Sequence, residues 1–189
     1  MKHGLLLKFA IHFVWILLLA PLNTQAQCDI LKSEMEDLKI YMNKVSQLTD
    51  SLQIYAESAA FGAQFKRARH NAHKVKFLMG EALTAADEAV TIAASAQYHS
   101  EICGINAVKT YAIDVENYIT DARNFADEAY LNAKNAVSSK NIGAIRYYMR
   151  KSQNASQEAR NSADDASFAV SYARSNCTHT NGQTVSIEK

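Results

Sequence analysis

An uninterrupted stripe of apolar residues runs through the stretch from Ile105 to Ala136. Its members are spaced alternately three and four residues apart, which is the heptad spacing of a helix packed along one face. They are Ile105, Val108, Ala112, Val115, Ile119, Ala122, Ala126, Ala129, Ala133 and Ala136. A helix of about nine turns that carries such a stripe must bury it against other helices. The stretch therefore predicts an all-α protein.

Three other stretches keep the same spacing, and each loses phase with the next. The first comprises Leu31, Met35, Leu38, Met42, Val45, Thr49, Leu52, Ala56 and Ala59; the second comprises Phe65, Ala68, Ala72, Val75, Met79, Ala82, Ala86, Ala89, Ala93 and Ala96; the last comprises Ile145, Tyr148, Ser152, Ala155, Ala159, Ser162, Ala166, Ala169 and Ala173. The phase breaks fall near Gly62, near Gly104 and near Asn141–Gly143. Glycine is common just past a helix end, so these breaks predict turns.

Four long helices follow, at about 29–60, 64–100, 104–138 and 142–175. Similar lengths and short turns predict an antiparallel, up-down-up-down four-helix bundle with alanine-rich heptad seams. Alternatively, one of these glycines marks only a stutter, an insertion that shifts the heptad repeat without ending the helix. The chain would then form fewer and longer helices. Alanine buries little apolar area, so we expect flanking aromatic residues to add to the core. They are Phe77, Tyr118, Phe125, Phe168 and Tyr172.

Residues 1–26 have the pattern of a cleaved secretory signal peptide. Lys2 and Lys8 precede a short apolar run, and small or polar residues lead to Ala26. The run is shorter than the ~20 residues that span a bilayer, which disfavours a membrane anchor. We expect a secreted or periplasmic protein of bacterial type, with residues 27–177 forming the bundle and 178–189 a flexible tail. Lipid attachment at Cys28 is disfavoured, since Gln27 stands where a small residue is needed.

Three cysteines remain after the leader: Cys28, Cys103 and Cys177. In the predicted bundle all three lie at one end. Export would place them in an oxidising compartment, where two of them are expected to form a disulfide. The sequence favours Cys28–Cys177, with Cys28–Cys103 as the alternative.

Metal, cofactor and catalytic motifs are not found. The seams carry no His, Asp or Glu, there is no Glu-x-x-His, and His70 and His73 flank the seam residue Ala72. We expect no cofactor and no metal site, and a surface metal site at the two histidines is a minor alternative. No nucleophile motif or phosphate-binding glycine loop is present, so we do not expect an enzyme.

Charge is distributed unevenly along the chain. Residues 58–80 and 129–157 contain no acidic residue but ten lysines and arginines, and they include two turns expected at the end opposite the cysteines. Removing Lys2 and Lys8 with the leader lowers the formal net charge from +1 to −1, so only the distribution points to a partner. The candidate site for an anionic partner comprises Lys66, Arg67, Arg69, Lys74, Arg146, Tyr147, Arg150 and Lys151.

These features predict an exported, non-catalytic interaction or structural module. Its basic end would contact another protein or an anionic surface, such as a lipid headgroup or an acidic glycan, whereas export disfavours nucleic acid. The alternative is a bundle that binds a small ligand or a metal ion. Apolar residues off the seams, such as Ile92, Ile113 and Tyr130, either flank the core or form the face of a homodimer.

Overall fold

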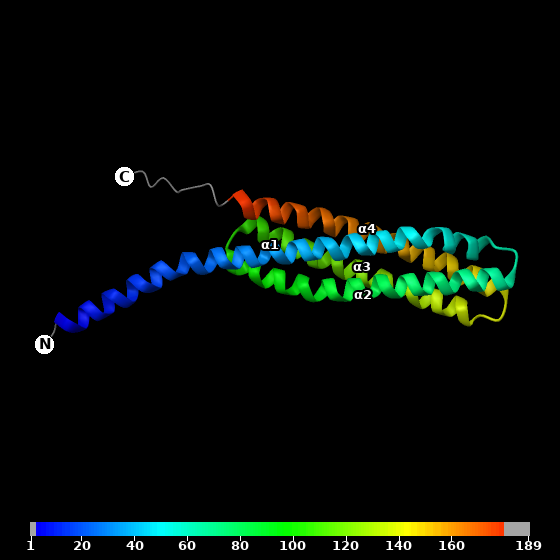
Figure 1. Ribbon diagram of the computed structural model, residues 1–189, viewed down its shortest axis with the longest axis horizontal. Coiled ribbons are helices and arrows are strands. Elements are labelled where there is room, and N and C mark those ends of the chain that lie inside the picture. The colour runs from blue at the N-terminus through cyan, green and yellow to red at the C-terminus, as the bar shows by residue number, and fades with distance from the viewer. Residues whose placement is uncertain (1–2, 180–189) are drawn as a thin grey trace.

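The computed structural model describes the backbone of residues 3–179 and the side chains of residues 26–177. This part of the chain forms four helices and no strand: α1 (His3–Phe61), α2 (Phe65–Cys103), α3 (Asn106–Ser138) and α4 (Ile142–His179). The helices lie side by side as a helical bundle (Figure 1), in which α1 packs against α2 and α4, and α3 packs against the same two helices. The all-α class and the number of helices are confirmed.

The helix ends agree with the predicted ones within a few residues, with one exception. α1 begins at His3, ahead of the predicted start at residue 29, so its backbone is helical through most of the predicted leader. The side chains of residues 1–25 and the tail residues 180–189 lie outside the described part of the chain, so the leader, its cleavage and the tail stay predictions. Among the residues whose side chains are described, none of the helices carries an apolar stretch that could span a bilayer.

The turns have different chemical causes. Gly104 ends α2 in the left-handed conformation with φ 75°, which a residue with a Cβ adopts at a cost. At the start of α4, the Oδ1 atom of Asn141 accepts a hydrogen bond of 2.8 Å from the backbone N–H of Ala144. Asn141 therefore acts as the N-cap, and Gly143 lies inside the first turn of α4.

The residues predicted to form the stripes are mostly buried. All nine on α1 are buried, as are those on α2 and α3 apart from the terminal residues Phe65 and Ile105, which are half-buried. Of the apolar residues predicted off the stripes, Ile92 and Tyr130 pack against the core, whereas Ile113 is 37% exposed. α1 contributes the large buried side chains, and the other helices contribute mainly alanine.

The predicted stripe of α4 is wrong at two positions. Tyr148 and Ser162 are only half-buried, and the neighbouring residues Met149 and Ala163 are fully buried in their place. Ser156, Val170 and Cys177 extend this adjacent row; they are also buried. An unbranched Met side chain fits an irregular apolar gap and leaves the Tyr148 hydroxyl nearer to solvent.

The expected contribution of flanking aromatic residues is also wrong for four of five residues. Phe125 packs against the core, but the others are exposed. The exposed fractions are 67% for Phe77, 37% for Tyr118, 65% for Phe168 and 43% for Tyr172. Alanine contacts let helices approach closely, so the space between them does not hold large rings.

The structure joins Cys28 to Cys103 in a disulfide, which corrects the pairing Cys28–Cys177 favoured from the sequence. Cys28 lies inside α1, on the same buried face as Leu31, and Cys103 is the last residue of the adjacent α2. Their Cα atoms are 5.2 Å apart, which suits the bond. Cys177 is buried in the same core cluster, and burial raises the pKa of its thiol.

The disulfide closes a loop between residues 75 positions apart, so its reduction should lower the free energy of unfolding by about 4 kcal/mol. Urea denaturation with and without a phosphine reductant measures the difference. The Cys177→Ala variant should keep this difference, and the Cys103→Ala variant should lose it. The reverse result would restore the Cys28–Cys177 pairing.

Candidate functional site

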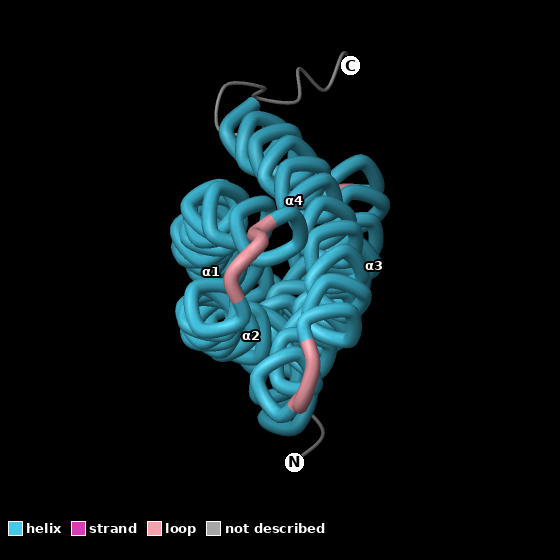
Figure 2. The backbone as a smooth tube through the Cα atoms, turned by 90° about the vertical axis from the view of Figure 1, so that its right-hand side faces the viewer, coloured by secondary structure: helices cyan, strands magenta, loops and turns pink. Residues whose placement is uncertain are grey.

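The α1–α2 turn and the start of α4 form one continuous surface. The Arg146 side chain of α4 donates two hydrogen bonds to the carbonyl oxygen of Gly62, from Nε at 3.2 Å and from Nη2 at 2.8 Å. Gly62 also approaches α1 closely, since a Cβ at this position would lie 2.5 Å from the carbonyl oxygen of Ser58. Figure 2 shows the α1–α2 and α3–α4 turns at the same end of the molecule. We call this end the basic tip, defined by the eight candidate residues predicted from the sequence.

Three of these residues are exposed in the first turns of α2: Lys66, Arg67 and Arg69. Lys74, about two turns further along α2, is also exposed, and its Nζ atom lies 4.5 Å from the ring centroid of Tyr55 on α1. The structure therefore places the α2 residues of the candidate site on the outer surface, where an anion has access.

Two of the cations contributed by α4, Arg150 and Lys151, lie over aromatic rings. The Arg150 guanidinium carbon lies 5.2 Å from the ring centroid of Phe61, and the Lys151 Nζ atom lies 5.1 Å from that of Tyr147. The side-chain hydrogen bond with Tyr147 is the main cause of the raised pKa of Lys151. Phe61 and Tyr147 are 67% and 55% exposed, so apolar surface and positive charge share the tip. The candidate residues chosen from the sequence do not include Phe61, although it is one of the aromatic residues that the sequence interleaves with the cations of this end.

Few acids lie near the cations of this end, although after Tyr147 the carboxylate of Glu128 also contributes to the raised pKa of Lys151. Among the described residues, none of the ten lysines and arginines of residues 58–80 and 129–157 forms a salt bridge. The two nearby acids of α1 have other contacts: Asp50 pairs with Arg160 at 3.1 Å, and Glu57 accepts a hydrogen bond of 3.3 Å from Gln53. The electrostatic potential of the tip therefore stays positive.

Several cations outside the two acid-free stretches are paired, although Lys39 and Lys44 of α1 form no salt bridge in the described structure. Lys109 lies 3.0 Å from Glu101, Arg123 lies 2.9 Å from Asp87, and Arg174 contacts Glu36. Ion pairs therefore link neighbouring helices outside the acid-free stretches, whereas no lysine or arginine inside those stretches forms one in the described structure.

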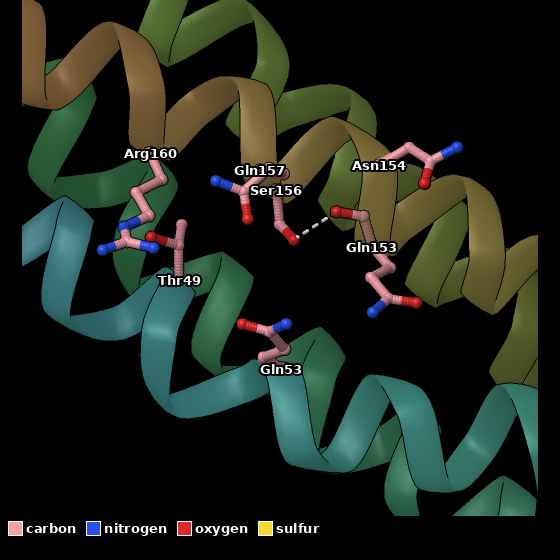
Figure 3. A pocket seen from close by; sticks show the side chains of 7 residues that line it. All are labelled: Thr49, Gln53, Gln153, Asn154, Ser156, Gln157 and Arg160. Atoms are coloured by element: carbon pink, nitrogen blue, oxygen red, sulfur yellow. Dashed lines mark hydrogen bonds between the residues drawn. The ribbon is translucent and has the colours of Figure 1, made fainter.

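Away from the basic tip, a groove lies between α1 and α4 and has a volume of about 240 Å³. Figure 3 shows its seven lining side chains: Thr49, Gln53, Gln153, Asn154, Ser156, Gln157 and Arg160. Thr49 and Ser156 donate their hydroxyl protons to carbonyl oxygens of their own helices, both at 2.8 Å. The only charged lining residue, Arg160, lies near Asp50 and Asp164, at 3.1 and 3.7 Å. Such a groove can exchange hydrogen bonds with water or a neutral ligand, but its lining offers no general base.

The histidines lie apart from carboxylates that could complete a metal site at the tip. His70 and His73 are exposed on α2, among the cations of residues 66–76. Within the described residues, no three His, Cys, Asp or Glu side chains are grouped to hold a metal ion. The surrounding positive charge also opposes binding of a divalent cation at this histidine pair.

Comparison of the chain with protein-family models, with curated proteins and with solved structures finds no match.

Arg146 holds the α1–α2 turn, so the Arg146→Ala variant should be destabilised. Loss of two charged hydrogen bonds to the half-buried Gly62 carbonyl should lower the free energy of unfolding by about 2 kcal/mol. The exposed Arg67 has no such contact, and its Arg67→Ala variant should stay within about 0.5 kcal/mol of the parent protein. Urea denaturation compares the two; equal losses would show that Arg146 does not fix the turn.

Proposed function

We propose that this protein is an exported, non-catalytic helical-bundle module that binds an anionic partner through its basic tip. One observation carries the proposal: the lysines and arginines of the two acid-free stretches form no salt bridge in the described structure, and they surround the α1–α2 turn and the start of α4, which Arg146 joins. Cations without salt bridges on an exposed surface attract anions at long range, and exposed Phe61 and Tyr147 add apolar contact area.

The proposal includes an up-down-up-down arrangement of heptad-packed helices. Cross-helix contacts support it, because residue numbers rise along one helix as they fall along its neighbour. Between α1 and α2, Glu34 accepts from Ser95 at 2.6 Å, and Ser58 accepts from Asn71 at 2.8 Å. Between α1 and α4, Ser46 donates to Asp164 at 2.6 Å and Asp50 pairs with Arg160. Antiparallel neighbours place the α1–α2 and α3–α4 turns together.

Export also belongs to the proposal. It rests on the leader pattern of residues 1–26 and gains support from the Cys28–Cys103 disulfide, since such bonds persist in oxidising compartments. A secreted or periplasmic protein meets acidic glycans, lipid headgroups and protein surfaces. Acidic glycans, anionic headgroups and acidic protein surfaces present clustered negative charge, which the positive charge of the basic tip complements.

The Arg67→Glu/Arg69→Glu variant tests the tip because both residues are exposed and neither holds a turn. A cation beside an anionic surface contributes about 1 kcal/mol, so reversing two should weaken binding by at least roughly tenfold. Two probes are used: immobilised heparin, a sulfated glycan, and vesicles of phosphatidylcholine with or without phosphatidylglycerol. Binding should fall as salt rises, since salt screens exposed charge.

The matched control is Lys39→Glu/Lys44→Glu, which changes the net charge equally at two α1 lysines outside the acid-free stretches. It should bind both probes nearly as well as the parent protein. Equal weakening in both variants would show that binding depends on net charge and not on the tip. Unchanged binding in the tip variant would show that the tip is not the contact surface. Circular dichroism confirms that each variant is folded.

A further inference from the structure

A shallow groove with a volume of about 330 Å³ lies along the α1–α2 interface, beyond the first turns of α2. Tyr55 comes from α1, and the other lining residues come from α2: His70, His73, Lys74, Phe77 and Leu78. Positions 70, 73, 74 and 77 share one face of a helix, which explains why these side chains converge. The volume is at the lower end of the range for small-molecule sites.

The groove has an apolar wall. Phe77 is 67% exposed, and Tyr55 and Leu78 beside it are half-buried. An aromatic ring this exposed contributes little to the core, but its face is available to stack with a planar group. The wall therefore suits a flat apolar body of one or two rings.

The groove also has a charged edge. The Lys74 ammonium lies 4.5 Å from the centroid of the Tyr55 ring, which draws this flexible side chain toward the groove. No acid occurs from residue 58 to residue 80, and Lys74 forms no salt bridge in the described structure. His70 and His73 add two ring nitrogens that can donate hydrogen bonds. An anionic group bound at this edge would meet donors and no competing carboxylate of residues 58–80.

We propose that this groove binds a small aromatic anion, with its ring against Phe77 and its carboxylate or sulfonate beside Lys74. The site shares Lys74 with the basic tip but does not otherwise depend on the function proposed for the tip. A macromolecular partner there would use Arg67, Arg69 and the α4 cations, whereas the groove depends on Phe77, which lies about three turns along α2.

The test uses 2-naphthoate, with 2-naphthamide as a neutral analogue of the same shape, and isotope-labelled protein with its disulfide intact. Titration by two-dimensional NMR should give saturable shifts of the Lys74, Phe77 and Leu78 amide signals with 2-naphthoate. The neutral analogue should bind at least about tenfold more weakly, because it lacks the charge that Lys74 attracts. Equal binding of the two compounds would overturn the proposal.

Two variants locate the site. Lys74→Glu and Phe77→Ala should each weaken 2-naphthoate binding by at least about tenfold, and both residues are exposed, so the fold should be retained. The matched controls are Lys44→Glu, on the exposed surface of α1, and Phe168→Ala, which removes a ring with nearly the same exposure on α4. Both controls should bind within about twofold of the parent protein. If Phe168→Ala weakens binding as much as Phe77→Ala, the groove is not the site.

The Arg67→Glu/Arg69→Glu variant separates this inference from the function proposed for the tip. It should lose heparin or vesicle binding and keep 2-naphthoate binding. Loss of 2-naphthoate binding in this variant, with Lys74 and Phe77 intact, would move the small-anion site to the tip and overturn the groove.

Discussion

Close packing of helices through alanine is the constraint on which the rest of this structure depends. α2, α3 and α4 bury mainly Ala, and α1 supplies larger side chains such as Leu31, Met35 and Leu52. Each alanine contact removes little apolar area from water, at about 25 cal/mol per Å². The bundle gains stability from the number of such contacts along its length, and the Cys28–Cys103 disulfide adds to it by restricting the unfolded chain.

A core made this way leaves chemistry to the surface. Large rings do not fit between closely spaced helices, which explains why Phe77 and Phe168 are about two-thirds exposed. The buried polar residues of the described part are few. Thr49, Ser100 and Ser156 donate to carbonyl oxygens of their own helices, whereas Asn71 and Ser152 bond across helices, to Ser58 and to the Ala129 carbonyl. Specific recognition must therefore come from the helix ends and outer faces, and charge differs most between the ends.

The buried residues of α1, α2 and α3 were predictable, because apolar residues at an alternating three-four spacing define which face of the helix is buried. The prediction was poor for α4, where two adjacent rows, one with Tyr148 and one with Met149, have similar apolar content. The pairing of Cys28 depends on whether its side chain faces α2 or α4. The heptad spacing does not fix the rotation of α1 about its axis closely enough to decide between them. The basic tip was predictable from the acid-free stretches, but the role of Arg146 was not, since its contact joins residues 84 positions apart.

The start of α2 shows that local stability does not account for the basic tip. Its N-cap residue, Gln64, makes no side-chain capping bond, and its first turn contains no acid. Lys66 and Arg67 instead place positive charge beside the positive end of the helix dipole, which is unfavourable. The Arg146 contact with Gly62 offsets part of this cost by fixing the preceding turn to α4. A negative partner at the tip would offset more, since it would meet both the cations and the uncapped N–H groups of the helix. The same charges that weaken the isolated helix end thus favour binding of an anion there.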